Sequence, residues 1–183
     1  TNTEPSFFGR WLLLHVKADW EPKDSGSLGK VYKSGSLIYV DAQSFLEFSK
    51  AKGSGNEEAI EDAKAKLEYH ILFEPTEKSS YAGYSTTKNY LILYSLDDVK
   101  EKLTFFRLGA NGGEFVLEGG DKEGKIQDSS ASGVDAKDSD LIWYSTSSYT
   151  QPSTLNLADA SKYGKDDFLI KESLKALPDM VRI

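Results

Sequence analysis

Cysteine is absent from the 183 residues, and methionine occurs once. Without cysteine the chain can form no disulfide framework, no thiol nucleophile and no thiolate metal site. Histidine is scarce too, because His15 and His70 are the only two. Zinc usually takes three or four protein ligands, so two histidines without cysteine do not make a stable transition-metal site. We therefore expect no metal and no cofactor.

Long apolar runs are also missing. The longest apolar patches, such as Tyr90 to Tyr94, are a few residues long, whereas a membrane-spanning helix needs about 20. Basic residues are in the minority, with 22 Lys and Arg against 29 Asp and Glu and a net charge of -7. This charge repels nucleic-acid backbones and anionic lipids. We expect neither a membrane span nor a nucleic-acid partner.

The chain begins at Thr1, and Thr1 to Ser6 is polar. This is typical of a chain whose signal or lipoprotein leader has been removed, and predicts a secreted, periplasmic or cell-envelope protein. A chain trimmed by design would begin in the same way. Its length predicts a single domain over 1–183, and the 12% aromatic content predicts an aromatic-rich core.

Alternation of apolar and polar residues with period two recurs along the chain and predicts eight or more short strands. They are Arg10 to Val16, Ser36 to Ala42, Lys66 to Glu74, Asn89 to Leu96, Lys102 to Leu108, Gly113 to Leu117, Asp140 to Ser145 and Asp167 to Lys171. The segments between them are rich in residues that tolerate positive φ, including Gly112-Gly113, Gly119-Gly120 and Ser130 to Asp135. Such spacing suits hairpins in a meander.

Two segments break the alternation and predict helices. Asn56 to Leu67 has apolar residues at helical spacing, and Leu155 to Tyr163 lies between Pro152 and Gly164. The order predicts an all-β fold, an eight-stranded or slightly larger antiparallel up-and-down β-barrel with a short helical insertion and a late α-helix. A closed barrel leaves no exposed sheet edge. A β-sandwich explains the strand count equally well, but has less use for a late helix followed by a returning strand.

The segment Phe8-Gly9-Arg10-Trp11 resembles the Gly-x-Trp signature of the lipocalins, a family of calycin barrels that bind small molecules. The segments Leu67 to Pro75, Tyr81 to Tyr84 and Lys88 to Ser95 resemble the middle of such a barrel. Thr87-Lys88-Asn89-Tyr90 stands where the family has a Thr-Asp-Tyr turn, so only Tyr90 carries over. The resemblance implies that Gly9 and Trp11 are structural signature residues at the closed end of the barrel.

The late arginine of the family has no clear counterpart. Ser145 or Ser147 stands where it is expected, and Arg107 could serve if the strand count is off by one hairpin. The order of a late helix and a final strand again resembles the lipocalins.

Period two places Trp11, Leu13 and His15 on one strand face, and predicts that His70 lies on the other side of its own strand. An inward His15 could bind a ligand head group or a haem iron, or could be a hydrogen-bonded core histidine, which we prefer. Aromatic rings would form the apolar wall of the cavity. The residues predicted to bind ligand are His15, Tyr39, Tyr69, Phe73, Tyr84, Tyr90, Tyr94 and Phe106.

Other chemistries have weaker sequence support. No nucleophile-elbow sequence accompanies the two histidines, which disfavours a serine hydrolase. The carboxylates Glu57, Glu58, Glu61 and Asp62 suit a solvated helix face, and Asp135, Asp138 and Asp140 suit a polar loop because no later bidentate glutamate follows.

The sequence therefore predicts binding, transport or sequestration of a small hydrophobic ligand, such as a lipid or pigment, without catalytic residues. One alternative is a lipocalin-like isomerase or cyclase that uses His15 and a neighbouring tyrosine as acid and base. The other is a surface protein that holds a protein partner through the loops Lys17 to Lys30 and Asp121 to Lys137.

Overall fold

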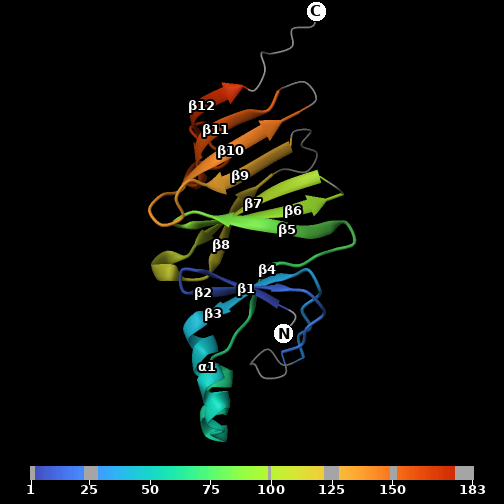
Figure 1. The fold of residues 1–183 in the computed structure, drawn as a ribbon, viewed down its shortest axis with the longest axis vertical. Helices are drawn as coiled ribbons and strands as arrows, with labels where there is room; N and C mark the ends of the chain where they lie inside the picture. The colour runs from blue at the N-terminus through green and yellow to red at the C-terminus, as the bar shows by residue number, and fades with distance from the viewer. Residues whose placement is uncertain (1–2, 23–28, 99, 122–127, 149–151, 176–183) are drawn as a thin grey trace, which may run out of the picture. The chain divides into compact units, whose positions relative to one another are not determined.

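The computed structural model of the chain describes residues 3–22, 29–98, 100–121, 128–148 and 152–175. The strands of this part of the chain form three separate four-stranded antiparallel sheets (Figure 1). Sheet 1 contains β1 (Thr3–Phe8), β2 (Trp11–Val16), β3 (Leu37–Asp41) and β4 (His70–Phe73). Sheet 2 contains β5 (Ser79–Thr86), β6 (Tyr90–Asp97), β7 (Lys100–Leu108) and β8 (Phe115–Gly120). Sheet 3 contains β9 (Asp128–Gly133), β10 (Leu141–Ser147), β11 (Thr154–Asp159) and β12 (Leu169–Lys175).

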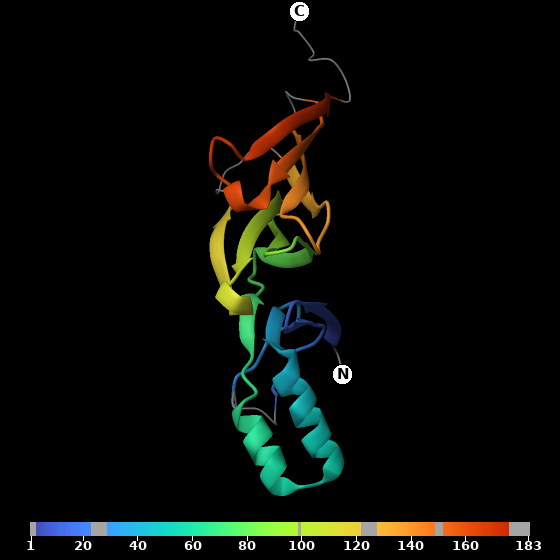
Figure 2. The same cartoon turned by 90° about the vertical axis from the view of Figure 1, so that its left-hand side faces the viewer.

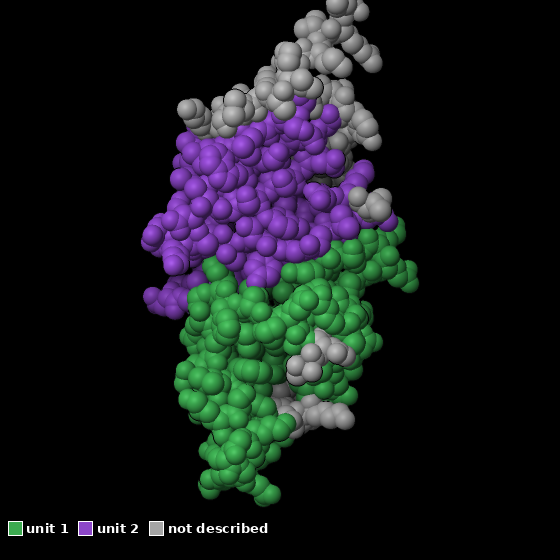
Figure 3. Space-filling model, viewed as in Figure 1, with its two compact units in different colours: residues 1–81 green, residues 82–183 purple. Residues whose placement is uncertain are grey.

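Within each sheet the strands lie side by side in chain order, so each sheet is a meander. The chain divides into two compact units, residues 1–81 and residues 82–183 (Figure 3). Unit 1 contains sheet 1, and unit 2 contains sheet 3 and most of sheet 2. That 1–183 forms a single domain stays a prediction.

Two helices are inserted between β3 and β4. They are α1 (Ala42–Ser54) and α2 (Glu57–Ala65), which form a helical hairpin (Figure 2). Asp41 caps α1 by accepting a hydrogen bond from the Ser44 amide over 2.8 Å, and Asn56 caps α2 in the same way. Gly55 ends α1 in the left-handed backbone conformation, at φ 70°, which glycine adopts with little strain because it has no Cβ. No helix of the described residues is long and apolar enough to cross a membrane.

The core of unit 1 joins one face of sheet 1 to the helices. Leu12, Leu14 and Val16 of β2 face this core, as period two requires, and Phe48 of α1 and Ala63 of α2 pack against the same core. The other members are Tyr32, Ile38, Val40, Leu67 and Tyr69.

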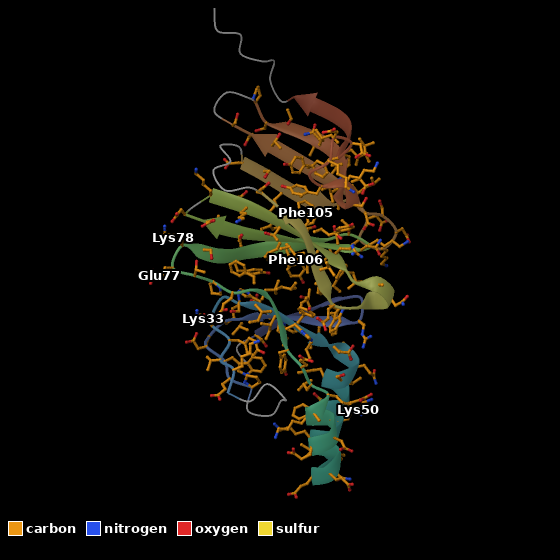
Figure 4. The ribbon with its side chains drawn as sticks, turned by 180° about the vertical axis from the view of Figure 1, so that it is seen from behind. Lys33, Lys50, Glu77, Lys78, Phe105 and Phe106 are labelled. Atoms are coloured by element: carbon orange, nitrogen blue, oxygen red, sulfur yellow. The ribbon has the colours of Figure 1, made fainter. Side chains whose placement is uncertain are left out.

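The core of unit 2 lies between sheets 2 and 3. Ile92 and Phe105 of sheet 2 pack with Ile142, Tyr144 and Ala158 of sheet 3, and all five are buried. Phe105 and Phe106, both labelled in Figure 4, are consecutive residues of β7 and therefore leave opposite faces of sheet 2. Phe105 lies on the face of sheet 2 that packs on sheet 3, so one face of each sheet forms the core of unit 2.

The predicted closed barrel is wrong. Each sheet has two edge strands, and no strand of one sheet pairs with a strand of another by backbone hydrogen bonding in the described part of the chain. The alternation located β2, β3, β6, β7 and β10 correctly, because period two reports strands. The alternation does not indicate whether strands far apart in the sequence pair with one another, and that pairing decides between a closed barrel and separate sheets.

The predicted late α-helix is also wrong. Residues 154–159 form β11, which pairs with β10 on one side and β12 on the other, and only Ala160–Lys162 makes a short 3-10 turn, η2. Pairing on both edges overrides the helical preference of Leu and Ala. The strand β1 lies where a polar tail was predicted, β9 lies in the predicted turn 130–135, and the helical insertion includes α1 as well as the predicted α2.

Candidate functional site

Unit 2 contains a pocket of about 470 Å³ at one end of its strands. The walls are formed by the β5–β6 turn, the end of β7, the β7–β8 turn, Asp140 just before β10 and Ser161 in the 3-10 turn η2 after β11. The lining residues are Asn89, Tyr90, Arg107, Leu108, Gly109, Ala110, Asn111, Gly112, Asp140 and Ser161. The pocket therefore collects residues that are up to 72 positions apart in the chain, since 161 minus 89 is 72.

Asp140 holds the β5–β6 turn in place. Its carboxylate accepts hydrogen bonds from the Thr87 hydroxyl over 2.7 Å, the Asn89 amide over 2.8 Å and the Asn89 side chain over 2.7 Å. The Thr87 amide also donates to the Tyr90 carbonyl over 2.8 Å, which closes the turn predicted at 87–90. One edge of the pocket is thus fixed by one carboxylate just before β10.

Arg107 and Tyr90 are two of the lining residues that carry hydrogen-bond donors. The Arg107 guanidinium forms an ion pair with Glu118 of β8, and this bond raises the pKa of Arg107. Burial raises the pKa of Tyr90, and the negative charges of Glu118 and Asp140 raise it further. Tyr90 therefore keeps its hydroxyl proton at neutral pH, so its hydroxyl stays a hydrogen-bond donor.

The floor of the pocket is a tight turn, η1 (Ala110–Gly112), with Asn111 at φ 56° and Gly112 at φ 76°. A Cβ at Gly109 would lie 2.6 Å from the Glu114 carbonyl, so only glycine fits there. This close approach fixes the loop that bounds the pocket, and confirms the predicted turn chemistry of this segment.

The lining residues can recognise a polar ligand but do not form a nucleophile with a base. They include neither histidine nor cysteine, and the hydroxyl of the lining serine, Ser161, donates to Asp159 over 2.7 Å. The Asp159 oxygen that accepts this bond also accepts from the Ser161 amide as the cap of the 3-10 turn η2, so the contact is a cap rather than a nucleophile with a histidine base. The chemistry that the pocket supports is binding.

Four of the eight residues predicted to bind ligand lie in unit 1 and four in unit 2. Of these eight, only Tyr90 lines the pocket. Tyr94 donates its hydroxyl to the Ala131 carbonyl, and Phe106 and Tyr84 are half-buried on β7 and β5. Whether any of the eight contacts a ligand stays a prediction.

The unit 1 members of this set belong to aromatic clusters. Tyr39 and Trp11 make an edge contact at 5.0 Å, and the His70 ring stacks on Tyr39 at 4.9 Å. Tyr69 contacts Trp20 at 5.1 Å in the core next to the helices. The predicted signature residue Trp11 is buried in sheet 1, and Gly9 forms the β1–β2 turn at φ 58°.

His15 lies against Tyr81 at 4.3 Å between ring centroids, with Glu4 Oε2 at 3.7 Å from its Nδ1. Burial lowers the pKa of His15, and the charge of Lys17 lowers it further, so the ring is mainly neutral at pH 7. Phe73 also contacts Tyr81, at 6.4 Å.

The predicted placement of the two histidines on opposite faces is wrong. His70 pairs with Tyr39, which pairs with Leu13 on the same face as His15. The register between β3 and β4 shifts between Leu37 and Ile38. Phe73 and His70, which unbroken alternation would place on opposite faces, therefore lie on the same face of the sheet.

No group of three or more His, Cys, Asp or Glu side chains in the described ranges could hold a metal ion. The predicted partner loops 17–30 and 121–137 lie partly outside these ranges.

Sequence reasoning missed the role of Asp140 and assigned Arg107 to a different function. The available signal was an aspartate directly before the apolar run 141–144, which is typical of a residue at a strand start. Nothing in the sequence connects Asp140 with Asn89, 51 residues earlier.

Four-stranded antiparallel meanders repeated along a chain are the units from which β-propellers are built. The fold therefore resembles a part of a propeller. It is similar to a post-proline cleaving enzyme from Rickettsia typhi, with a TM-score of 0.64 and 20% identity, over 96% of this chain and 21% of that protein. No family model matches the chain.

A curated relative is similar in sequence. The uncharacterized peptidase y4nA of Sinorhizobium fredii is 29% identical over 152 residues, which are 81% of this chain and 17% of that protein. The chain thus spans about a fifth of the length of the proteins it matches.

These similarities overturn the functional expectations from the sequence. The matched proteins are peptidases, so the lipocalin resemblance, the apolar carrier and the expectation of a non-enzyme are wrong. The isomerase and the loop-binding surface protein do not fit them either. Export from the cell and the lack of a nucleic-acid partner stay predictions.

Proposed function

We propose that this chain is a β-propeller portion of a peptidase of the post-proline cleaving type, and that it recognises peptide rather than cleaving it. The observation that carries the proposal is the similarity of fold to the Rickettsia enzyme over 96% of the chain. The sequence similarity to the uncharacterized Sinorhizobium peptidase supports the peptidase part of this assignment.

The pocket supports a recognition role. A peptide presents alternating amide donors and carbonyl acceptors, and the pocket offers Tyr90 and Arg107 as donors with Asp140 beside them. Arg107 is also suited to a peptide carboxylate because a guanidinium binds such a group through two parallel bonds. The groups that break the peptide bond would come from outside these 183 residues.

A graft tests the proposal. The segment of the Rickettsia enzyme that matches this chain is replaced by residues 1–183, and cleavage of a fluorogenic peptide is measured with proline or alanine before the scissile bond. We expect the graft to cleave after proline and the isolated chain to leave both peptides intact. A graft that folds, by circular dichroism and sedimentation, without cleaving after proline contradicts the proposal. Cleavage by the isolated chain contradicts the recognition role.

A matched pair of variants tests the role of the pocket in the same graft. Arg107→Ala is expected to raise KM with little change in kcat, because it removes binding rather than chemistry. Lys50→Ala removes an equal charge from an exposed position on α1, labelled in Figure 4, and should leave both constants unchanged. Equal effects of the two variants would remove Arg107 from the recognition site.

A further inference from the structure

Tyr90 combines a buried ring with a hydroxyl that has no partner within the described ranges. The side chain is 6% exposed and belongs to the core of unit 2, yet it also lines the pocket. In this part of the chain the fully enclosed side-chain atoms without a partner are Ser36 Oγ and Asn156 Oδ1, so the Tyr90 hydroxyl is not sealed in the core. Buried tyrosine hydroxyls usually find a hydrogen-bond partner. The pocket is the side from which that partner can come.

Arg107 lies directly beside Tyr90. The two residues pair across β6 and β7, so their side chains leave the same face of sheet 2, next to the core pair Ile92 and Phe105. The Arg107 Nε atom donates to Glu118, whereas its two Nη groups form no hydrogen bond with any described residue. The guanidinium therefore keeps N–H donors for a ligand.

The other charged or hydroxyl-bearing side chains that line the pocket are already engaged. Asp140 uses both carboxylate oxygens for the three hydrogen bonds that hold the β5–β6 turn. The Ser161 hydroxyl donates to Asp159. The groups that remain open in this set belong to Tyr90 and Arg107, and both are donors.

A carboxylate is the ligand group that fits two neighbouring donors best. It has two acceptor oxygens and no donor of its own. A guanidinium binds it through parallel N–H bonds, and a hydroxyl can donate to the same oxygens. A peptide amide, in contrast, would bring an N–H for which Tyr90 and Arg107 offer no strong acceptor.

We propose that Tyr90 and Arg107 form a carboxylate-binding site, which holds a carboxylate of the peptide substrate at its C-terminal end or on an acidic side chain. This inference rests on the proposed function and adds the chemical group that the pocket recognises. It also makes Tyr90 a binding residue, although its ring is part of the core.

Three acetylated peptides separate the two sources of the carboxylate. N-acetyl-trialanine has a free C-terminal carboxylate, its C-terminal amide has no charge, and N-acetyl-Ala-Asp-Ala amide has a carboxylate on its side chain alone. Binding to the isolated chain is measured by NMR from the amide shifts of Asn111 and Gly112, which line the pocket. We expect one of the carboxylate peptides to bind about tenfold more tightly than the uncharged peptide. Equal or undetectable binding of all three overturns the inference.

A fourth peptide tests the opposite charge. Trialanine amide with a free amino end is a cation, and the carboxylates of Glu118 and Asp140, whose charges raise the pKa of Tyr90, would attract it. We expect this peptide to bind no better than the uncharged one. Tighter binding of the cation than of both carboxylate peptides overturns the inference.

Variants test the two donors in the isolated chain. Tyr90→Phe removes the hydroxyl and keeps the ring, and should weaken carboxylate binding by about threefold to tenfold. Tyr32→Phe is the matched control, because it removes a buried tyrosine hydroxyl in unit 1, bonded to the Tyr69 carbonyl, and should leave binding unchanged. Arg107→Lys keeps the charge but loses the parallel N–H bonds, and should also weaken binding. Unchanged binding by Tyr90→Phe and Arg107→Lys overturns the inference.

The two proposals can fail separately. A graft that cleaves after proline with the same KM for substrates with and without the preferred carboxylate overturns the carboxylate site and leaves the proposed function standing. Carboxylate binding by the isolated chain, together with a graft that folds but does not cleave, supports the site and counts against the proposed function.

Discussion

The Tyr163 hydroxyl donates a hydrogen bond of 2.5 Å to Oδ1 of Asp121, and the other oxygen of this buried carboxylate accepts from the Ser129 hydroxyl over 2.9 Å and from the Leu103 amide over 3.2 Å. Leu103 belongs to sheet 2 and Ser129 to sheet 3. One carboxylate therefore connects both sheets of unit 2 with the turn after β11, while the Tyr163 ring stacks on Phe105 at 4.1 Å.

Tyr163→Phe should lower the free energy of unfolding by about 1–3 kcal/mol, because a buried carboxylate loses one of its donors. Urea unfolding gives the change, and the ring contact with Phe105 is kept. Asp121→Ala should cost more, since it removes the acceptor of the Tyr163, Ser129 and Leu103 bonds together. The double variant should be less destabilised than the sum of the single variants. Strict additivity would show that the two side chains do not stabilise each other.

The stability of unit 2 should fall at alkaline pH. Burial raises the pKa of Tyr163, and the bond to Asp121 and its charge raise it further above the ordinary value of 10.0. Tyrosine in the unfolded chain loses its proton near pH 10, whereas the folded state keeps it. The contribution is therefore complete below pH 10 and is lost as the pH rises toward the folded-state pKa.

The change in the free energy of unfolding with pH measures this effect. Each such tyrosine contributes about 1.4 kcal/mol per pH unit in that window, so the alkaline slope of Tyr163→Phe should be smaller than that of the wild type by about this amount. Urea unfolding between pH 10 and pH 12 provides the comparison. Identical slopes would mean that Tyr163 titrates alike in both states.

Asp140→Ala should release the β5–β6 turn, because three hydrogen bonds to Thr87 and Asn89 are lost. We expect a loss of about 1–3 kcal/mol and faster hydrogen exchange at the Asn89 amide. Asp138→Ala is the matched control, since Asp138 is exposed two residues earlier, and should change stability by less than about 0.5 kcal/mol. An unchanged exchange rate at Asn89 would contradict the assigned role of Asp140.

Gly133 and Gly53 should respond in opposite directions to alanine. A Cβ at Gly133 would lie 2.2 Å from the Thr86 carbonyl, so Gly133→Ala forces the backbone of β9 away from that of β5. We expect the free energy of unfolding to fall by about 1–3 kcal/mol. Gly53 of α1 has open space around it, and Gly53→Ala should stabilise the helix by about 0.5–1 kcal/mol. Thermal unfolding checks both, and a neutral Gly133→Ala would show that β9 can move away from β5.

The sequence was sufficient where structure is local. Alternation located the strands around Leu13, Tyr39 and Ile92, and the cap and turn residues at Asn56 and Gly112 were recognisable. It failed where a distant partner decides the outcome. Leu155 to Ala158 is extended because β10 and β12 pair with it on both sides. The pocket was unpredictable for the same reason, since Asp140 and Asn89 meet only through the packing of sheet 3 on sheet 2.

The helical hairpin between β3 and β4 has a practical consequence for engineering. Tyr39 pairs directly with His70, so both ends of the inserted segment are clamped by the sheet. The far end at Ser54 and Gly55 is exposed, and lengthening such a loop adds little closure entropy. A foreign peptide, an affinity tag or a fluorescent reporter spliced in at this tip would travel with the protein and leave the register of sheet 1 unchanged.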